Sequence, residues 1–192
     1  MKNNSERLSD ILSWLDSISY IKTEKIPEVD LYMDQVTSFV DEHLKKTKRS
    51  PEDKALTKTM INNYTKNHLL PPPDKKKYSR DHILLMIFIY YFKNFLPISD
   101  IKTILGPLTD KYFHKDADLN LEAIYTTLFS KEDTFVQEVL ENVMKQFHMS
   151  ADLFPDAPKA DQASLREFTF ICMLSLDIYL KKQLIEAILD KK

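Results

Sequence analysis

The sequence predicts a mainly all-α protein, and three observations support this. Apolar residues recur at three- and four-residue spacing along most of the 192-residue chain, which is typical of amphipathic helices. The single glycine, Gly106, leaves no Asn-Gly or Asp-Gly pair for a two-residue β-hairpin turn. The longest apolar run, residues 83–92, is about half the roughly 20 residues that a membrane span needs. We therefore expect helices, few strands and no membrane-spanning segment.

The first three helices follow from periodicity and capping. Residues 8–18 carry one apolar stripe, and Asp30 is a suitable N-cap for a second helix that runs to Leu44. A polar segment, residues 47–54, separates this helix from a third over residues 56–67. The pattern is that of a helix-turn-helix.

Prolines and serines delimit the next helices. Prolines 71–73 end the third helix, because proline lacks an N–H donor and fixes φ. Ser79 is expected to cap an apolar helix over residues 80–95 that is buried on most sides, and Ser99 a short helix that stops near Gly106-Pro107. Further helical patterns lie at residues 119–129, 134–147 and 162–189.

Charge is distributed unevenly along the chain. The whole chain has a net charge of −2, but Lys45 to Arg80 contains 11 basic residues against three acids. This segment therefore carries +8, a field that would attract phosphates. The alternative is an ordinary solvated stretch of lysines.

The third helix has two contrasting faces. Met60, Ile61 and Tyr64 cluster on one side and are expected to pack inward. The other side has no acid, and its polar residue types can contact base edges or phosphates; it carries Lys58, Thr59, Asn62, Asn63 and Lys66. The alternative is an ordinary polar surface.

The stretch LTKTMINNYTKNHLLPPPDKKKYSRDHILLMIFIYYFKNFLPISDIKTIL resembles the N-terminal winged helix-turn-helix domain of MerR-type regulators. The matching positions are Ile61 and Tyr64 in the helix, residues 69–72, residues 77–79 at the end of the wing, and residues 98–102 in a second helix pair. The wider chain resembles a Gram-positive bacterial family of proposed transcriptional regulators.

The resemblance implies double-stranded DNA as the partner. It places a recognition helix, residues 57–67, in the major groove and a basic wing, residues 73–80, on phosphates. Residues 1–108 would then form the N-terminal helix and DNA-binding domain, and residues 109–192 a small C-terminal helical bundle. Wing contacts are expected from Lys75, Lys76, Lys77, Tyr78 and Arg80. One departure is Asn67-His68 where the family has glycine, although both residue types tolerate a left-handed turn.

Residues 162–189 leave three roles open: the core of a small bundle, a homodimer interface, or a pocket for a small-molecule effector. No HExxH motif or Cys/His spacing suits zinc. We therefore expect no catalytic residues, metal or cofactor, and no enzymatic activity. The lone Cys172 and the polar first residues indicate a cytoplasmic protein.

A second function class also fits the sequence: a helical protein-interaction module that uses the same fold without sequence-specific DNA binding. Salt distinguishes the two, because phosphate contacts weaken steeply as salt rises, whereas an apolar partner groove does not.

Overall fold

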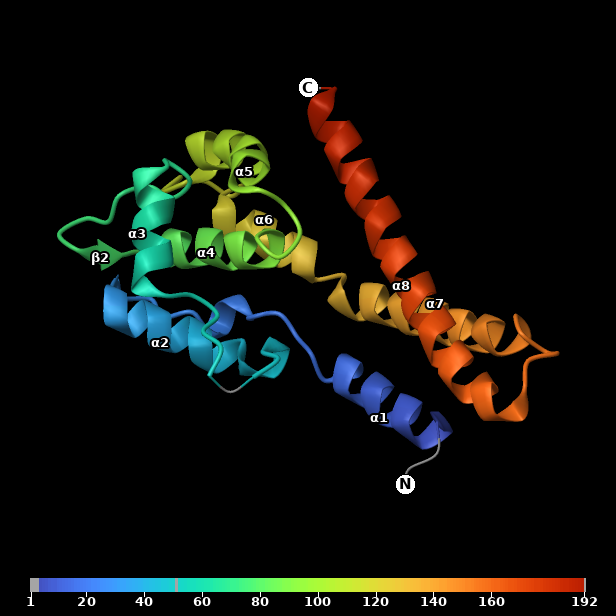
Figure 1. The fold of residues 1–192 in the computed structure, drawn as a ribbon. Helices are drawn as coiled ribbons and strands as arrows, with labels where there is room; N and C mark the ends of the chain where they lie inside the picture. The colour runs from blue at the N-terminus through green and yellow to red at the C-terminus, as the bar shows by residue number, and fades with distance from the viewer. Residues whose placement is uncertain (1–3, 51, 192) are drawn as a thin grey trace. The chain divides into compact units, whose positions relative to one another are not determined.

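The computed structural model describes residues 4–50 and 52–191, and it divides the chain into two compact units. One unit is Ile18–Lys131, and the other combines Met1–Ser17 with Glu132–Lys192. Both are built mainly from helices, which confirms the predicted fold class (Figure 1). No helix in the described ranges is long and apolar enough to cross a membrane.

The Ile18–Lys131 unit contains five α-helices, two short 3-10 helices and a small two-stranded sheet among its described residues. In chain order these elements are η1 (Thr23–Lys25), β1 (Leu31–Tyr32), α2 (Met33–His43), η2 (Lys45–Thr47), α3 (Lys58–Lys66), β2 (Lys77–Tyr78), α4 (Arg80–Phe92), α5 (Ile98–Tyr112) and α6 (Leu121–Phe129).

Helix α4 forms the core of this unit. Its residues from His82 to Tyr90 are all buried, and α5, α6 and β2 pack around it. Such a helix is apolar on every side because it has no solvent-facing surface. The expectation that the apolar run forms a helix buried on most sides is confirmed.

Helix α6 belongs to the same unit, which moves the expected domain boundary. Tyr125 is fully buried, its hydroxyl donates to the Ile21 carbonyl oxygen at 2.8 Å, and its ring lies edge-on to Phe88. These contacts join α6 to α4 and to the start of the unit, so compact packing continues to Lys131. The domain boundary that the sequence predicted after residue 108 would cut through α5, inside this unit, so that prediction is wrong.

Helix α5 does not stop at Gly106-Pro107 as expected. It continues through Pro107 to Tyr112, with Ile101 and Leu105 buried on its inner face. Proline removes only its own N–H donor, and the buried face on the preceding turns holds the helix in place. The helix starts after Pro97, so Ser99 is not its N-cap.

The start of α2 also differs from the expectation. β1 pairs antiparallel with β2, with Leu31 opposite Tyr78 and Tyr32 opposite Lys77. This pairing keeps residues 31–32 extended, so the N-cap is Tyr32 rather than Asp30. Its backbone N–H donates to the Gln35 side chain at 2.8 Å.

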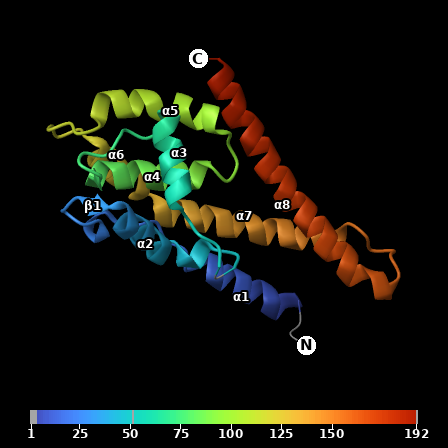
Figure 2. The same cartoon turned by 60° about the vertical axis from the view of Figure 1, so that its left-hand side comes forward.

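The second unit contains α1 (Asn4–Asp16), α7 (Glu132–Asp152) and α8 (Lys159–Asp190). Helix α8 has 32 residues against 21 in α7, and it continues beyond the point where the two helices cross (Figures 1 and 2). Leu8 is the one buried large apolar side chain among those described in this unit. Much apolar surface therefore stays uncovered in a single copy.

Candidate nucleic-acid interface

Helix α3 is fixed by its first turn and by its inner face. The Thr57 side chain accepts a hydrogen bond from the Met60 backbone N–H at 3.2 Å, which caps the helix. Ile61 and Tyr64 are buried, as the spacing predicted. Burial raises the pKa of the Tyr64 phenol.

The opposite side of α3 faces solvent. The predicted base- and phosphate-contacting residues are all exposed: Lys58, Thr59, Asn62, Asn63 and Lys66. One acid lies beside this face, because the Lys58 ammonium pairs with Asp34 of α2. Both of these side chains are well exposed, so their ion pair adds little stability, and Lys58 can leave Asp34 for another anion.

The end of α3 uses the left-handed conformation that the sequence predicted. His68 has φ of 56°, and the Leu69 N–H donates to the Tyr64 carbonyl oxygen at 2.8 Å. This bond satisfies one of the last carbonyls of the helix. The turn that a glycine would usually make is therefore made here by histidine.

A tight turn lies at the tip of the predicted wing. The Lys77 N–H donates to the Asp74 carbonyl oxygen at 2.7 Å, and the two central residues, Lys75 and Lys76, have φ of 45° and 67°. Positive φ at both positions is the signature of a type I′ hairpin turn. The expectation that no two-residue hairpin turn occurs is therefore wrong. The loop between α3 and β2 projects beyond the helices (Figure 1).

The remaining residues of the predicted wing differ in their access to solvent. Lys75 and Lys76 are exposed, and the Lys77 ammonium lies 5.3 Å from the centroid of the Tyr32 ring. Tyr78 is only 3% exposed, and burial raises the pKa of its phenol. The Tyr78 hydroxyl, which the resemblance placed against a DNA phosphate, is therefore packed inside the unit.

The Arg80 side chain forms its hydrogen bonds within the protein. Its Nε and Nη2 donate to the two carboxylate oxygens of Glu122, both at 2.7 Å, and Nη1 donates to Glu28 at 3.0 Å. Nη1 also donates to the Ile26 carbonyl at 2.5 Å, and Nη2 to that of Thr23 at 2.8 Å. All five guanidinium donors are therefore used. The expected phosphate contact at Arg80 is replaced by a structural role.

Acids from outside the basic segment reduce its field. The Asp41 carboxylate accepts from Lys48 at 2.7 Å and lies 3.5 Å from Lys54. The hydrogen bond from Lys48 lowers the pKa of Asp41. The segment's +8 is thus partly neutralised in space. By contrast, Lys66, Lys75 and Lys76 have no ion pair within the described ranges.

Sequence reasoning missed a histidine at the base of the predicted wing. The Ser79 backbone N–H donates to Nδ1 of His82 at 3.0 Å, so Nε2 carries the proton and faces the Pro72 carbonyl oxygen at 3.3 Å. His82 is buried, and the Ser79 hydroxyl lies 2.8 Å from both His82 Nδ1 and His114 Nε2. The ring therefore contacts both ends of the predicted wing, at Pro72 and Ser79.

The pKa of His82 is lowered, chiefly because burial disfavours the charged ring. His114 lowers it further, whereas the Pro72 carbonyl, Asp81 and Asp30 act in the opposite direction. The folded protein therefore holds this ring neutral at a pH where the unfolded chain already binds a proton.

This shift predicts a loss of stability in mild acid. As pH falls below about 6.5, the unfolded chain takes up a proton at His82 before the folded protein does, so the free energy of unfolding falls. The slope from this group is at most about 1.4 kcal/mol per pH unit. Urea unfolding between pH 7.5 and 5 should show a shallower dependence in His82→Gln, whose amide can still reach the Ser79 N–H. Equal slopes in the two proteins would contradict the assignment.

No three His, Cys, Asp or Glu side chains lie close enough to hold a metal ion in the part of the chain that the structure describes. The geometry instead offers a helix face, a projecting turn and exposed cations.

Comparison with known proteins identifies one family. No curated protein and no solved structure matches the chain. Residues 21–128 match a family described as "Domain of unknown function (DUF1836)". The match covers more than half of the chain and lies within the Ile18–Lys131 unit. This protein therefore belongs to the DUF1836 family.

Proposed function

We propose that the Ile18–Lys131 unit is a MerR-like winged helix-turn-helix domain that binds double-stranded DNA and regulates transcription, rather than an enzyme. Helices α2 and α3 are the helix-turn-helix, and α3 enters the major groove. The turn at Lys75-Lys76 contacts phosphates as the tip of the wing. The observation that carries this proposal is the placement of two unpaired lysines in left-handed conformation on a projecting turn.

The backbone at this turn favours a charge-based role. A non-glycine residue in the left-handed region costs roughly 1–2 kcal/mol, and glycine would remove that cost. Lys75 and Lys76 both adopt it. Backbone strain concentrates at functional sites, and the property that lysine adds here is positive charge. Phosphate oxygens are the partners that two exposed ammonium groups would attract.

Base reading is proposed for the exposed side of α3. Asn62 lies at its middle, and its amide can pair bidentately with adenine N6 and N7. Thr59 can contact a thymine methyl, and Lys66 a guanine or a phosphate. Lys58 joins them if a phosphate replaces Asp34 as its partner.

We further propose that two copies pair through α8, which would bring two DNA-binding units to one site. Eight large apolar side chains of α8 are more than half exposed in a single copy: Phe168, Ile171, Leu176, Ile178, Tyr179, Leu180, Leu184 and Ile188. With roughly 150–250 Å² for a large side chain, they present on the order of 800 Å². These side chains lie on several sides of the helix, and Leu180, Leu184 and Ile188, spaced four residues apart, share the side on which we place the contact.

The wing provides the test of DNA binding. After selection of a binding site from random DNA, Lys75→Asn and Lys76→Gly together should weaken binding and make the log-affinity against log-salt slope shallower by about 1.8, because two phosphate contacts are lost. The same substitutions should hold or raise the free energy of unfolding, because Asn-Gly is preferred in a type I′ turn. Fluorescence anisotropy and urea unfolding measure the two effects.

The matched control removes two exposed lysines elsewhere in the same unit. Lys22→Gln with Lys25→Gln changes the net charge equally but leaves the wing intact. Its salt slope should stay that of the natural protein. If the wing variant and the control behave alike, the wing is not part of the interface. If the natural protein shows no salt-dependent DNA binding, a protein partner becomes the better explanation of this fold.

A further inference from the structure

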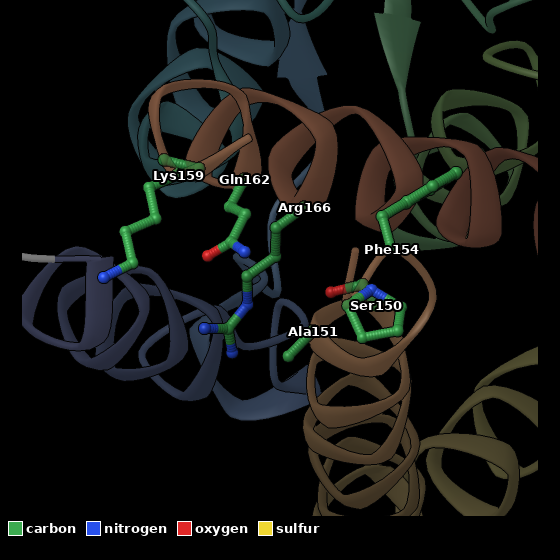
Figure 3. Close-up of a pocket in the computed structure, with 8 residues that line it drawn as sticks. Ser150, Ala151, Phe154, Lys159, Gln162 and Arg166 are labelled. Carbon is green, nitrogen blue, oxygen red and sulfur yellow. The ribbon is translucent and has the colours of Figure 1, made fainter. Parts of the chain in front are cut away.

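A pocket of about 480 Å³ lies at the corner between α7 and α8 (Figure 3). The last turn of α7, the connecting residues 153–158 and the first two turns of α8 form its walls. Its apolar lining includes Ala151, Phe154, Pro155 and Ala163. The volume is within the range of small-molecule sites.

The polar lining of this pocket is cationic. Lys159, Gln162 and Arg166 are spaced three and four residues apart, so they share one side of α8, and Figure 3 shows them extending together from that helix. No acid lines the pocket. Within the described ranges, neither Lys159 nor Arg166 forms an ion pair. The first turn of α8 adds the positive end of a helix dipole.

Arg166 contrasts with Arg80 in the use of its donors. Its Nε is buried without a hydrogen-bond partner, and Nη2 makes one long bond of 3.5 Å to the Phe147 carbonyl oxygen. Its guanidinium carbon lies 3.9 Å from the centroid of the Phe147 ring, which holds the group in place. A buried unpaired donor carries a free-energy cost that a partner would remove.

We propose that this pocket binds a small organic anion. Its carboxylate or phosphate head accepts hydrogen bonds from the Arg166 guanidinium and lies near the Lys159 ammonium. Its apolar part packs on Phe154 and Pro155. Because all of these residues belong to one unit, the site is independent of the proposed DNA-binding function, and each can fail without the other.

The arginine Nε–H resonances provide a direct test on the full chain, which contains only four arginines. Sodium benzoate, phenyl phosphate and neutral benzyl alcohol are titrated separately at constant ionic strength. Either anion should shift the Arg166 Nε–H signal, assigned by its absence in Arg166→Gln, and leave that of Arg80 unchanged. No shift with either anion, or equal binding of benzyl alcohol, would overturn the proposal.

Calorimetry with the same anions separates this site from general charge attraction. Arg166→Gln should weaken binding roughly ten- to hundred-fold, as expected for loss of charge-assisted hydrogen bonds, and Lys159→Gln less. Lys145→Gln removes an exposed charge of α7 outside the pocket and should leave affinity unchanged. An equal loss in Lys145→Gln would also overturn the proposal. If Arg166→Gln unfolds, the Lys159→Gln and Lys145→Gln pair still decides between the outcomes.

Discussion

Replacing Arg80 with alanine is expected to lower the free energy of unfolding by roughly 3 kcal/mol. The side chain is only 17% exposed, so water cannot fully replace it. Its loss leaves the Glu122 carboxylate and the carbonyl oxygens of Thr23 and Ile26 without their donor. Urea unfolding followed by circular dichroism measures the change.

Arg80→Lys is the informative comparison. Lysine keeps the charge but has three donors on one atom, so it cannot reproduce five bonds spread over a planar fork. It should recover only part of the lost stability. At a temperature where the variants are folded, DNA affinity should stay close to that of the natural protein. A stable Arg80→Ala protein with weakened DNA binding would show instead that Arg80 contacts phosphate.

Lysine substitutions on α8 are expected to convert a dimer into a monomer. In an antiparallel pair of α8 helices centred on Leu184, Leu180 of one copy faces Ile188 of the other, and Asp177 faces Lys191. Apolar residues therefore meet apolar residues, and the acid meets the base. Leu184→Lys places two ammonium groups at the centre of this contact. Leu184→Lys with Ile188→Lys should raise the dimer dissociation constant by at least about a hundred-fold.

Sedimentation equilibrium on the full chain measures this change. Ser175→Lys is the control, because Ser175 is exposed and lies nine residues from Leu184, half a turn around the helix. It should leave the dimer intact. A natural protein that is monomeric at tens of micromolar would contradict pairing through α8. Equal dissociation in the control and in the Leu184 variant would place the contact elsewhere.

The candidate site was only partly predictable from sequence. The inward and outward faces of α3 follow from spacing alone, and Asn67-His68 indicated the left-handed turn that His68 makes. The hairpin turn at Lys75-Lys76 carries no glycine signal, and β2, which follows it directly, pairs with β1. That pairing joins residues more than forty positions apart, which no local pattern reveals.

The sequence by itself determined the helical fold class, the buried α4 and the two faces of α3, because these depend on apolar spacing within a few turns. Tertiary structure decided which cations remain available. Arg80 meets Glu122, and Lys48 meets Asp41, only after distant or separate elements pack together. The same packing placed Tyr125 against Ile21 and so extended the unit to Lys131. Coulomb and hydrogen-bond energies depend on distance in space, and a sequence gives only distance along the chain.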